Sequence, residues 1–104
     1  RPSMTRYHQS GTRRDACALL YEAGELPGQR LKTRLESHYD TRLDPKRFYS
    51  LLEKLERSGH VERREAELKD LYSLTDAGER ALLDHYDWLG ERIADGQDVQ
   101  EGEK

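Results

Sequence analysis

Hydrophobic residues recur every three or four positions in the first half of the chain, which is the spacing of an α-helix. A first helix is predicted to begin with Thr12 as its N-cap, supported by Asp15 three residues on, and to end at Gly24. Leu31 and Leu35 predict a second, shorter helix that reaches about residue 39. Its outward face is expected to carry three cations: Arg30, Lys32 and Arg34.

The third predicted helix has the clearest pattern. Asp44 can cap it, Pro45 suits the first helical position because no N–H is needed there, and Gly59 marks its end. The apolar positions follow the order i, i+3, i+4, i+7: Phe48, Leu51, Leu52 and Leu55. The opposite face is polar and starts with two cationic turns: Lys46, Arg47, Ser50, Glu53, Lys54 and Arg57, with Tyr49 on the flank.

The pattern then changes to the alternation of β-strands. Residues 60–64 and 71–74 predict two short strands joined by 65–70 as a hairpin, which must pack on the helices because two strands alone are marginal. Thr75 is predicted to cap a last helix. The apolar stripe of this helix is wider than a small domain needs, which favours a partner helix: Leu82, Leu83, Tyr86, Trp88, Leu89 and Ile93.

The element order predicts a mainly α fold with a small β-hairpin, a winged helix-turn-helix. The third helix can enter a major groove, about 12 Å wide, while its apolar side packs on the first two helices. The predicted organisation has four segments: a flexible N-terminal arm at 1–11, a DNA-binding domain at 12–75, a dimerisation helix at 76–95 and a disordered acidic tail at 96–104. Within the arm, residues 1–3 could be a remnant before a native Met4.

The charge of the chain is divided between its two halves. The 104 residues carry a net −3, but residues 1–64 hold 14 basic and 9 acidic side chains, a net +5, whereas residues 65–104 hold 4 and 12, a net −8. A basic half of this kind fits a polyanion such as double-stranded DNA. Over the whole chain Arg outnumbers Lys 13 to 5. This ratio and the acidic second half fit a concentrated-salt cytoplasm, and inorganic ions could bind the acidic surface.

Other classes of protein are excluded or disfavoured. Cys17 is the single cysteine, so no internal disulfide can form, and an intracellular, cytoplasmic location at the nucleoid is expected. Cys17 is read chiefly as a packing residue, with a redox sensor as the less favoured alternative. No membrane-spanning run, cofactor motif or catalytic motif occurs, so neither membrane association nor enzyme activity nor a cofactor is expected. The histidines are isolated, which disfavours a metal site: His8, His38, His60 and His85.

Two runs of sequence, 48–62 and 72–82, together resemble the PadR family of transcriptional regulators. The first reads F-Y-x-x-L-x-x-L-E-x-x-G-x-V-E and the second Y-S-L-T-D-A-G-x-x-A-L. The resemblance covers about residues 44–83, and the two runs are separated by the length that a wing requires. With its acidic surface, the chain also resembles the small haloarchaeal members of that family, of the RosR oxidative-stress regulator type.

The resemblance implies a dimeric DNA-binding regulator whose last helix contributes to the dimer interface, and whose Tyr49 and preceding residues approach the DNA. The chain departs from the family in two places. Where family members usually have Gly and Thr or Ser, it has Lys46 and Arg47. Its wing is acidic rather than rich in Gly, Arg and Lys.

Three groups of residues are therefore expected to bind DNA. Recognition-helix contacts are expected from Lys46, Arg47, Tyr49, Ser50 and Lys54. Backbone contacts around the first two helices are expected from Arg13, Arg14, Arg30, Lys32 and Arg34. Wing contacts are expected from Arg63, Arg64 and Lys69. The alternative for the cations of the third helix is that they form an ordinary solvated helix face without a ligand.

The predicted function is sequence-specific DNA binding by a homodimer on a pseudo-palindromic operator, with a link to oxidative stress. Two recognition helices about 34 Å apart would read such a site. The predicted dimer interface comprises Leu82, Leu83, Tyr86, Leu89 and Ile93. The alternative is a winged-helix protein-interaction module without DNA binding, which the acidic wing favours.

Overall fold

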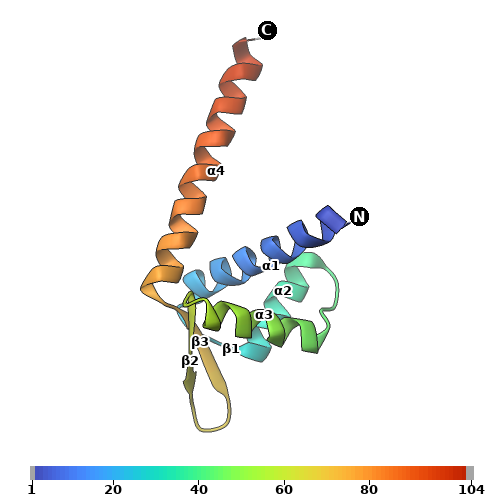
Figure 1. Cartoon of the computed structure of the whole chain (residues 1–104), viewed down its shortest axis with the longest axis vertical. Coiled ribbons are helices and arrows are strands. Elements are labelled where there is room, and N and C mark those ends of the chain that lie inside the picture. Colours follow the sequence, from blue (N-terminus) through green and yellow to red (C-terminus); the bar gives the residue numbers. More distant parts are fainter. Residues whose placement is uncertain (1, 103–104) are drawn as a thin grey trace.

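The structure, a computed structural model, combines helices with a small antiparallel sheet (Figure 1). It describes the backbone of residues 2–102 and the side chains of residues 11–97. Within this range the elements are α1 (Pro2–Ala23), β1 (Leu26–Pro27), α2 (Gly28–Tyr39), α3 (Pro45–Arg57), β2 (Val61–Glu65), β3 (Asp70–Leu74) and α4 (Asp76–Gly102). The mainly helical winged helix-turn-helix predicted from the sequence is confirmed.

The ends of α3 follow the signals in the sequence. The carboxylate of Asp44 accepts a hydrogen bond from the backbone N–H of Arg47 at 3.0 Å, as an N-cap does, and Pro45 occupies the first turn. Gly59 follows the helix with φ +84°, a conformation that glycine adopts without steric cost. Thr75 caps α4 in the same way, because its hydroxyl accepts from the N–H of Gly78 at 3.0 Å.

Both terminal helices are longer than predicted. The helix expected to start at Thr12 begins at Pro2, so residues 2–11 continue α1 instead of forming an arm. Likewise 96–102, expected as a tail, continue α4 to Gly102. A capping preference is a weak local signal that does not prevent a residue from lying inside a helix, which is why it misplaced the start. Residues 1, 103 and 104 lie outside the described range.

Asp15 has a tertiary partner instead of a capping role. Its carboxylate accepts a hydrogen bond from the hydroxyl of Tyr39, at the end of α2. Partial burial, reinforced by this hydrogen bond, raises the pKa of Tyr39 to about 12. The contact fastens the C-terminal end of α2 to the middle of α1.

The wing contains one strand more than the sequence predicted. β2 and β3 form the expected hairpin, with Val61 opposite Leu74 and Glu65 opposite Asp70. The additional strand β1 pairs with the other edge of β3, where Leu26 lies opposite Tyr72. The sheet order is therefore β1-β3-β2. Because β1 belongs to the connection between α1 and α2, this pairing attaches the wing to the helical body.

The core lies between α1, α2, α3 and the sheet. Its buried residues come from every element except α4: Ala16, Cys17, Leu20, Leu26, Leu31, Leu35, Phe48, Leu52, Leu55, Val61 and Tyr72. From α4, only Leu82 packs against this core, and it does so partly. The whole of α4 has 27 residues and is about 40 Å long. Beyond its first turns it projects away from the body and diverges from α1 (Figure 1).

One glycine sets the approach of α4 to the body. A Cβ added to Gly78 would overlap the backbone carbonyl of His60, whose carbon would lie 2.8 Å away. The same carbonyl accepts a hydrogen bond from the N–H of Thr75 at 3.0 Å. Only glycine therefore allows the first turn of α4 to lie against the segment that links α3 to β2.

Replacing Gly78 by Ala should lower the free energy of unfolding by about 1–3 kcal/mol, the usual cost of overpacking. Urea denaturation followed by circular dichroism measures this change. Gly90→Ala is the matched control on the same helix, because no atom lies within 4 Å of its added Cβ. It should raise stability by about 0.5–1 kcal/mol through helix propensity. Equal effects of the two substitutions would contradict the proposed contact.

Candidate nucleic-acid interface

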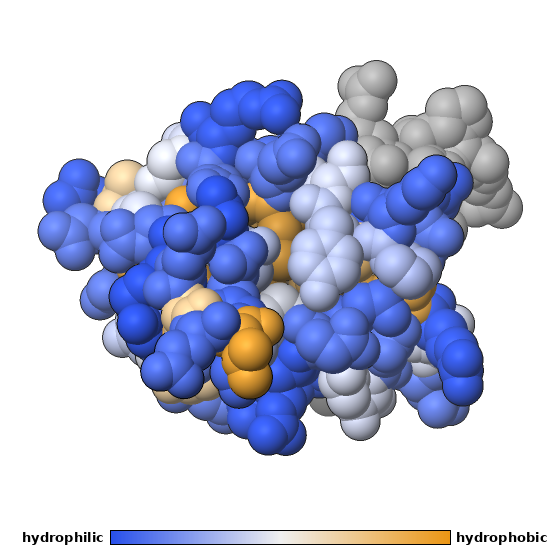
Figure 2. Space-filling view, turned by 90° about the horizontal axis from the view of Figure 1, so that it is seen from below, coloured by the Kyte–Doolittle hydropathy of each residue, from blue (hydrophilic) through white to orange (hydrophobic). Residues whose placement is uncertain are grey.

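The outward face of α3 is polar. Lys46, Ser50, Glu53 and Arg57 follow one another at intervals of four, three and four residues, so they share one side of the helix, and all are exposed. The opposite side is held in the core. Seen from below, the end of the molecule that carries the wing is hydrophilic over most of its surface, with small separate hydrophobic patches (Figure 2). α3 therefore presents hydrogen-bonding groups, as reading base edges requires.

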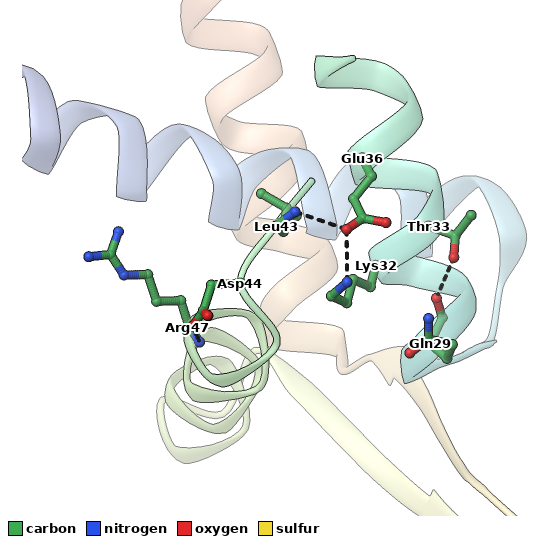
Figure 3. A network of polar contacts seen from close by, with 7 residues as sticks. All are labelled: Gln29, Lys32, Thr33, Glu36, Leu43, Asp44 and Arg47. Carbon is green, nitrogen blue, oxygen red and sulfur yellow. Dashed lines mark hydrogen bonds and ion pairs between the residues drawn. The ribbon is translucent and has the colours of Figure 1, made fainter. Parts of the chain in front are cut away.

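The cations at the start of α3 are available to a ligand. Lys46 and Arg47 are exposed and form no ion pair with any described residue. Figure 3 shows the side chain of Arg47 extended away from the capping carboxylate of Asp44, which binds only its backbone N–H. Arg57, further along the same face, was not among the predicted contacts, and it pairs with Glu53 at 3.1 Å.

Tyr49 lies on the flank of α3 that faces the beginning of α2. A Cβ on Gly28 would lie 3.0 Å from a ring carbon and 3.2 Å from the hydroxyl of Tyr49, so the absence of a side chain there allows the close contact. Tyr49 remains 41% exposed. No side chain caps the first turn of α2. The tyrosine hydroxyl and the uncapped N–H groups thus adjoin one another, an arrangement suited to an anion.

The connection between α2 and α3 is fixed by Glu36 (Figure 3). Its Oε2 accepts from the ammonium of Lys32 and from the backbone N–H of Leu43, both at 2.8 Å. The bond from Lys32, followed by the bond from Leu43, lowers the pKa of Glu36 below its ordinary value of 4.5. The carboxylate is therefore charged at neutral pH and holds the residues just before the recognition helix.

The structure contradicts the prediction that Lys32 lies on the outward face of α2. Its side chain is buried, and the residue is only 9% exposed. Helical spacing had placed it beside Arg30 and Arg34, which are both exposed. A lysine can lay its methylene groups along apolar surface while its ammonium binds a nearby carboxylate, and periodicity does not reveal such a partner. Arg42, exposed in the connection before α3, is a further cation that no helical spacing pointed to.

The predicted cations do not form one surface. Lys54 lies on the flank of α3 opposite Tyr49, where it lines a groove of about 310 Å³ with Arg13 and Arg14 of α1. The groove opens between α1, the end of α3 and the beginning of α4, and His60 and His85 also line it. These cations are thus grouped on the side of α3 that faces α1 and α4, away from Tyr49 and the first turn of α2.

Cys17 also lines this groove, but it is 8% exposed. Burial raises the pKa of its thiol to about 11. A sensor cysteine needs a thiolate near neutral pH, and this thiol stays protonated there. The packing role is the one that the structure favours.

The wing cations differ in their surroundings. Arg64 forms an ion pair with Glu25, and Arg63 is held by Asp70 at 3.1 Å. Lys69 is exposed and pairs with none of the described residues. Two of the three predicted wing contacts are therefore already neutralised within the chain.

Residues 18–84 match the sequence profile of the transcriptional regulator PadR-like family. The chain belongs to this family. It is accordingly a DNA-binding transcriptional regulator with a winged-helix fold, as the two sequence runs implied. A search of curated proteins gives no match. No helix in the described part of the chain is long and apolar enough to cross a membrane.

Solved structures agree with this assignment. RosR of H. salinarum superposes with a TM-score of 0.74 at 27% identity, over 78% of this chain and 74% of RosR. A structure of RosR in a complex, RosR-S1, covers 86% of this chain and 82% of that one, with the same score and identity. A regulator from Thermoplasma acidophilum, 21% identical, shares the fold with a TM-score of 0.74 over 92% of this chain and 96% of its own.

In this PadR-family protein, Glu36→Gln should lower the unfolding midpoint at neutral pH, because the ion pair with Lys32 is lost and the loop is held less firmly. A carboxyl whose pKa is depressed in the folded state stabilises the fold above about pH 4.5, and this contribution disappears as the pH falls through the depressed value. The parent and the variant should therefore converge in acid, which thermal unfolding across pH measures.

Glu53→Gln is the matched control for this experiment. Glu53 also pairs with a cation four residues away, but both partners are largely exposed, so the loss should be small. A constant difference between Glu36→Gln and the parent from neutral to acid pH would contradict the role of the Glu36 carboxylate.

Proposed function

We propose that this protein is a homodimeric, sequence-specific regulator that places α3 in the major groove of a pseudo-palindromic operator. The observation that carries the proposal is the exposed first half of α3, where Lys46 and Arg47 have no ion-pair partner among the described residues. Helix-turn-helix proteins read bases with the N-terminal part of this helix. Family membership supports the same assignment.

Each part of the interface has a proposed role. Lys46, Arg47 and Ser50 would reach base edges, since cationic and hydroxyl side chains pair with groove acceptors. Tyr49 and the first turn of α2 would bind a phosphate, together with Arg30. The remaining candidates for phosphate contacts are Arg13, Arg14, Arg34, Lys54 and Lys69.

The second copy is proposed to cover the apolar stripe of α4. The stripe has almost no partner within the described chain, because only Leu82 reaches the core. Its other members are exposed: Leu83 38%, Leu89 42%, Trp88 51%, Ile93 56% and Tyr86 71%. An amphipathic helix in this state is stabilised by packing against another apolar surface. A twofold axis along α4 would place the two α3 helices about 34 Å apart, which is the spacing of successive major grooves on one side of the DNA.

The signal that controls the regulator is a separate matter. The likeness to RosR supports a role in the response to oxidative stress in the cytoplasm. Cys17 would not be its sensor, because the buried thiol is protonated at neutral pH. The acidic surface of α4 and the wing remains a proposed site for inorganic ions.

Lys46→Ala and Arg47→Ala should each weaken operator binding by about 1–3 kcal/mol if each side chain reads a base. Fluorescence anisotropy with DNA from the promoter nearest its own gene measures the affinity, and a scrambled duplex measures specificity. Arg80→Ala is the matched control, because Arg80 is an exposed arginine on α4 and not on α3. A parent protein that binds neither duplex would favour the protein-interaction module instead.

Ile93→Glu should convert the protein to a monomer at micromolar concentration, because it places a charge on the apolar stripe. Sedimentation velocity gives the mass of the parent and the variant. Asp95→Lys, two residues further and on the opposite side of the helix, also changes the charge of this turn and should leave a dimer. A monomeric parent would overturn the proposed dimer without affecting the assignment of α3.

A further inference from the structure

An ion pair joins the wing to the connection between α1 and β1. Arg64 of β2 donates two hydrogen bonds to Glu25, from Nε to Oε2 at 3.1 Å and from Nη2 to Oε1 at 2.9 Å. The residues are 39 positions apart in the sequence, so only the fold brings them together. Paired bonds of this kind are the geometry with which a guanidinium binds either a carboxylate or a phosphate.

Both partners are charged under ordinary conditions. The hydrogen bond from Arg64 lowers the pKa of Glu25 below its ordinary value of 4.5. The arginine keeps its proton throughout the physiological range. Because the side chains are 62% and 36% exposed, the pair lies at the surface, where a polyanion could compete for the guanidinium.

The wing does not depend on this pair for its position. β3 is hydrogen-bonded on one edge to β2 and on the other to β1. Val61 and Tyr72 of the wing are buried in the core. An exposed ion pair adds little stability to such an arrangement. The strong geometry of the Glu25–Arg64 pair therefore calls for an explanation other than wing placement.

The second wing arginine is neutralised in the same way. Around Arg63, carboxylate oxygens of Asp70, Glu56 and Glu65 lie at 3.1, 3.6 and 3.9 Å. The chain thus supplies an internal acid to both arginines of the hairpin. Lys69 is left as the wing cation without an ion pair to any described residue.

We propose that Glu25 acts as an internal substitute for a DNA phosphate, which keeps Arg64 from the DNA backbone and so limits both the affinity and its dependence on salt. The inference rests on the proposed DNA binding by α3. A cation that already holds a carboxylate neutralises no phosphate, so it releases no counterion from the DNA. The regulator would then depend on α3 for binding. The wing would lie close to the DNA, but Arg64 would neutralise no phosphate.

The experiment measures the affinity for operator DNA as a function of KCl concentration for the parent and four variants. Glu25→Gln should free Arg64, bind more tightly at low salt and steepen the slope of log K against log[KCl] by about 0.9, the value for one phosphate. Arg64→Gln should leave the slope of the parent unchanged. The double variant Glu25→Gln/Arg64→Gln should return to the slope of the parent, because the freed cation is absent.

Glu62→Gln is the matched control for charge. Glu62 lies two residues before Arg64 on β2, on the same side of the strand, and its side chain forms no ion pair with any described residue. The Glu62→Gln substitution removes the same negative charge without freeing an arginine. Its slope of log K against log[KCl] should therefore equal that of the parent. A Glu25→Gln slope equal to that of Glu62→Gln overturns the proposal, and so does an Arg64→Gln slope shallower by about 0.9, which would show that Arg64 already binds a phosphate. A parent without affinity for DNA would instead refute the proposed function itself.

Discussion

Burial of Phe48, Leu52 and Leu55 against the other helices fixes the rotation of α3 about its own axis. The rest of the interface depends on this constraint. Once the apolar stripe is inside, Lys46 and Ser50 must lie outside, because residues on opposite sides of a helix cannot exchange places without exposing the core. The cap at Asp44 and the hold of Glu36 on the preceding loop then fix where the helix begins. The reading surface is thus positioned by packing behind it and by hydrogen bonds before it.

The cations proposed or predicted to meet DNA lie in three different environments. Those at the start of α3 are free of ion pairs within the described residues, those of α1 line the groove with Lys54, and the two arginines of the wing hold internal acids. The net +5 of the first 64 residues therefore overstates the charge that DNA would meet. The available charge depends on where the acids lie, because an arginine paired with a carboxylate attracts a phosphate only weakly.

α4 shows how a long helix can be anchored at one end only. Gly78 lets its first turn lie against His60, and Leu82 packs on the core, but the following turns leave the body. A projecting helix with an apolar stripe is stable in water when a second surface covers that stripe. The same feature that makes α4 a weak part of the monomer makes it suited to dimerisation.

The sequence by itself determined the order of the four helices and the hairpin, the caps at Asp44 and Thr75 and the two sides of α3, because these follow from local spacing and capping chemistry. It also carried the family, through motifs that include Gly78. Only the tertiary structure decided the pairing of β1 with β3, the burial of Lys32 and the ion pair between Glu25 and Arg64. Each of these joins or buries residues according to what lies opposite them in space, and periodicity along the chain carries no information about such neighbours.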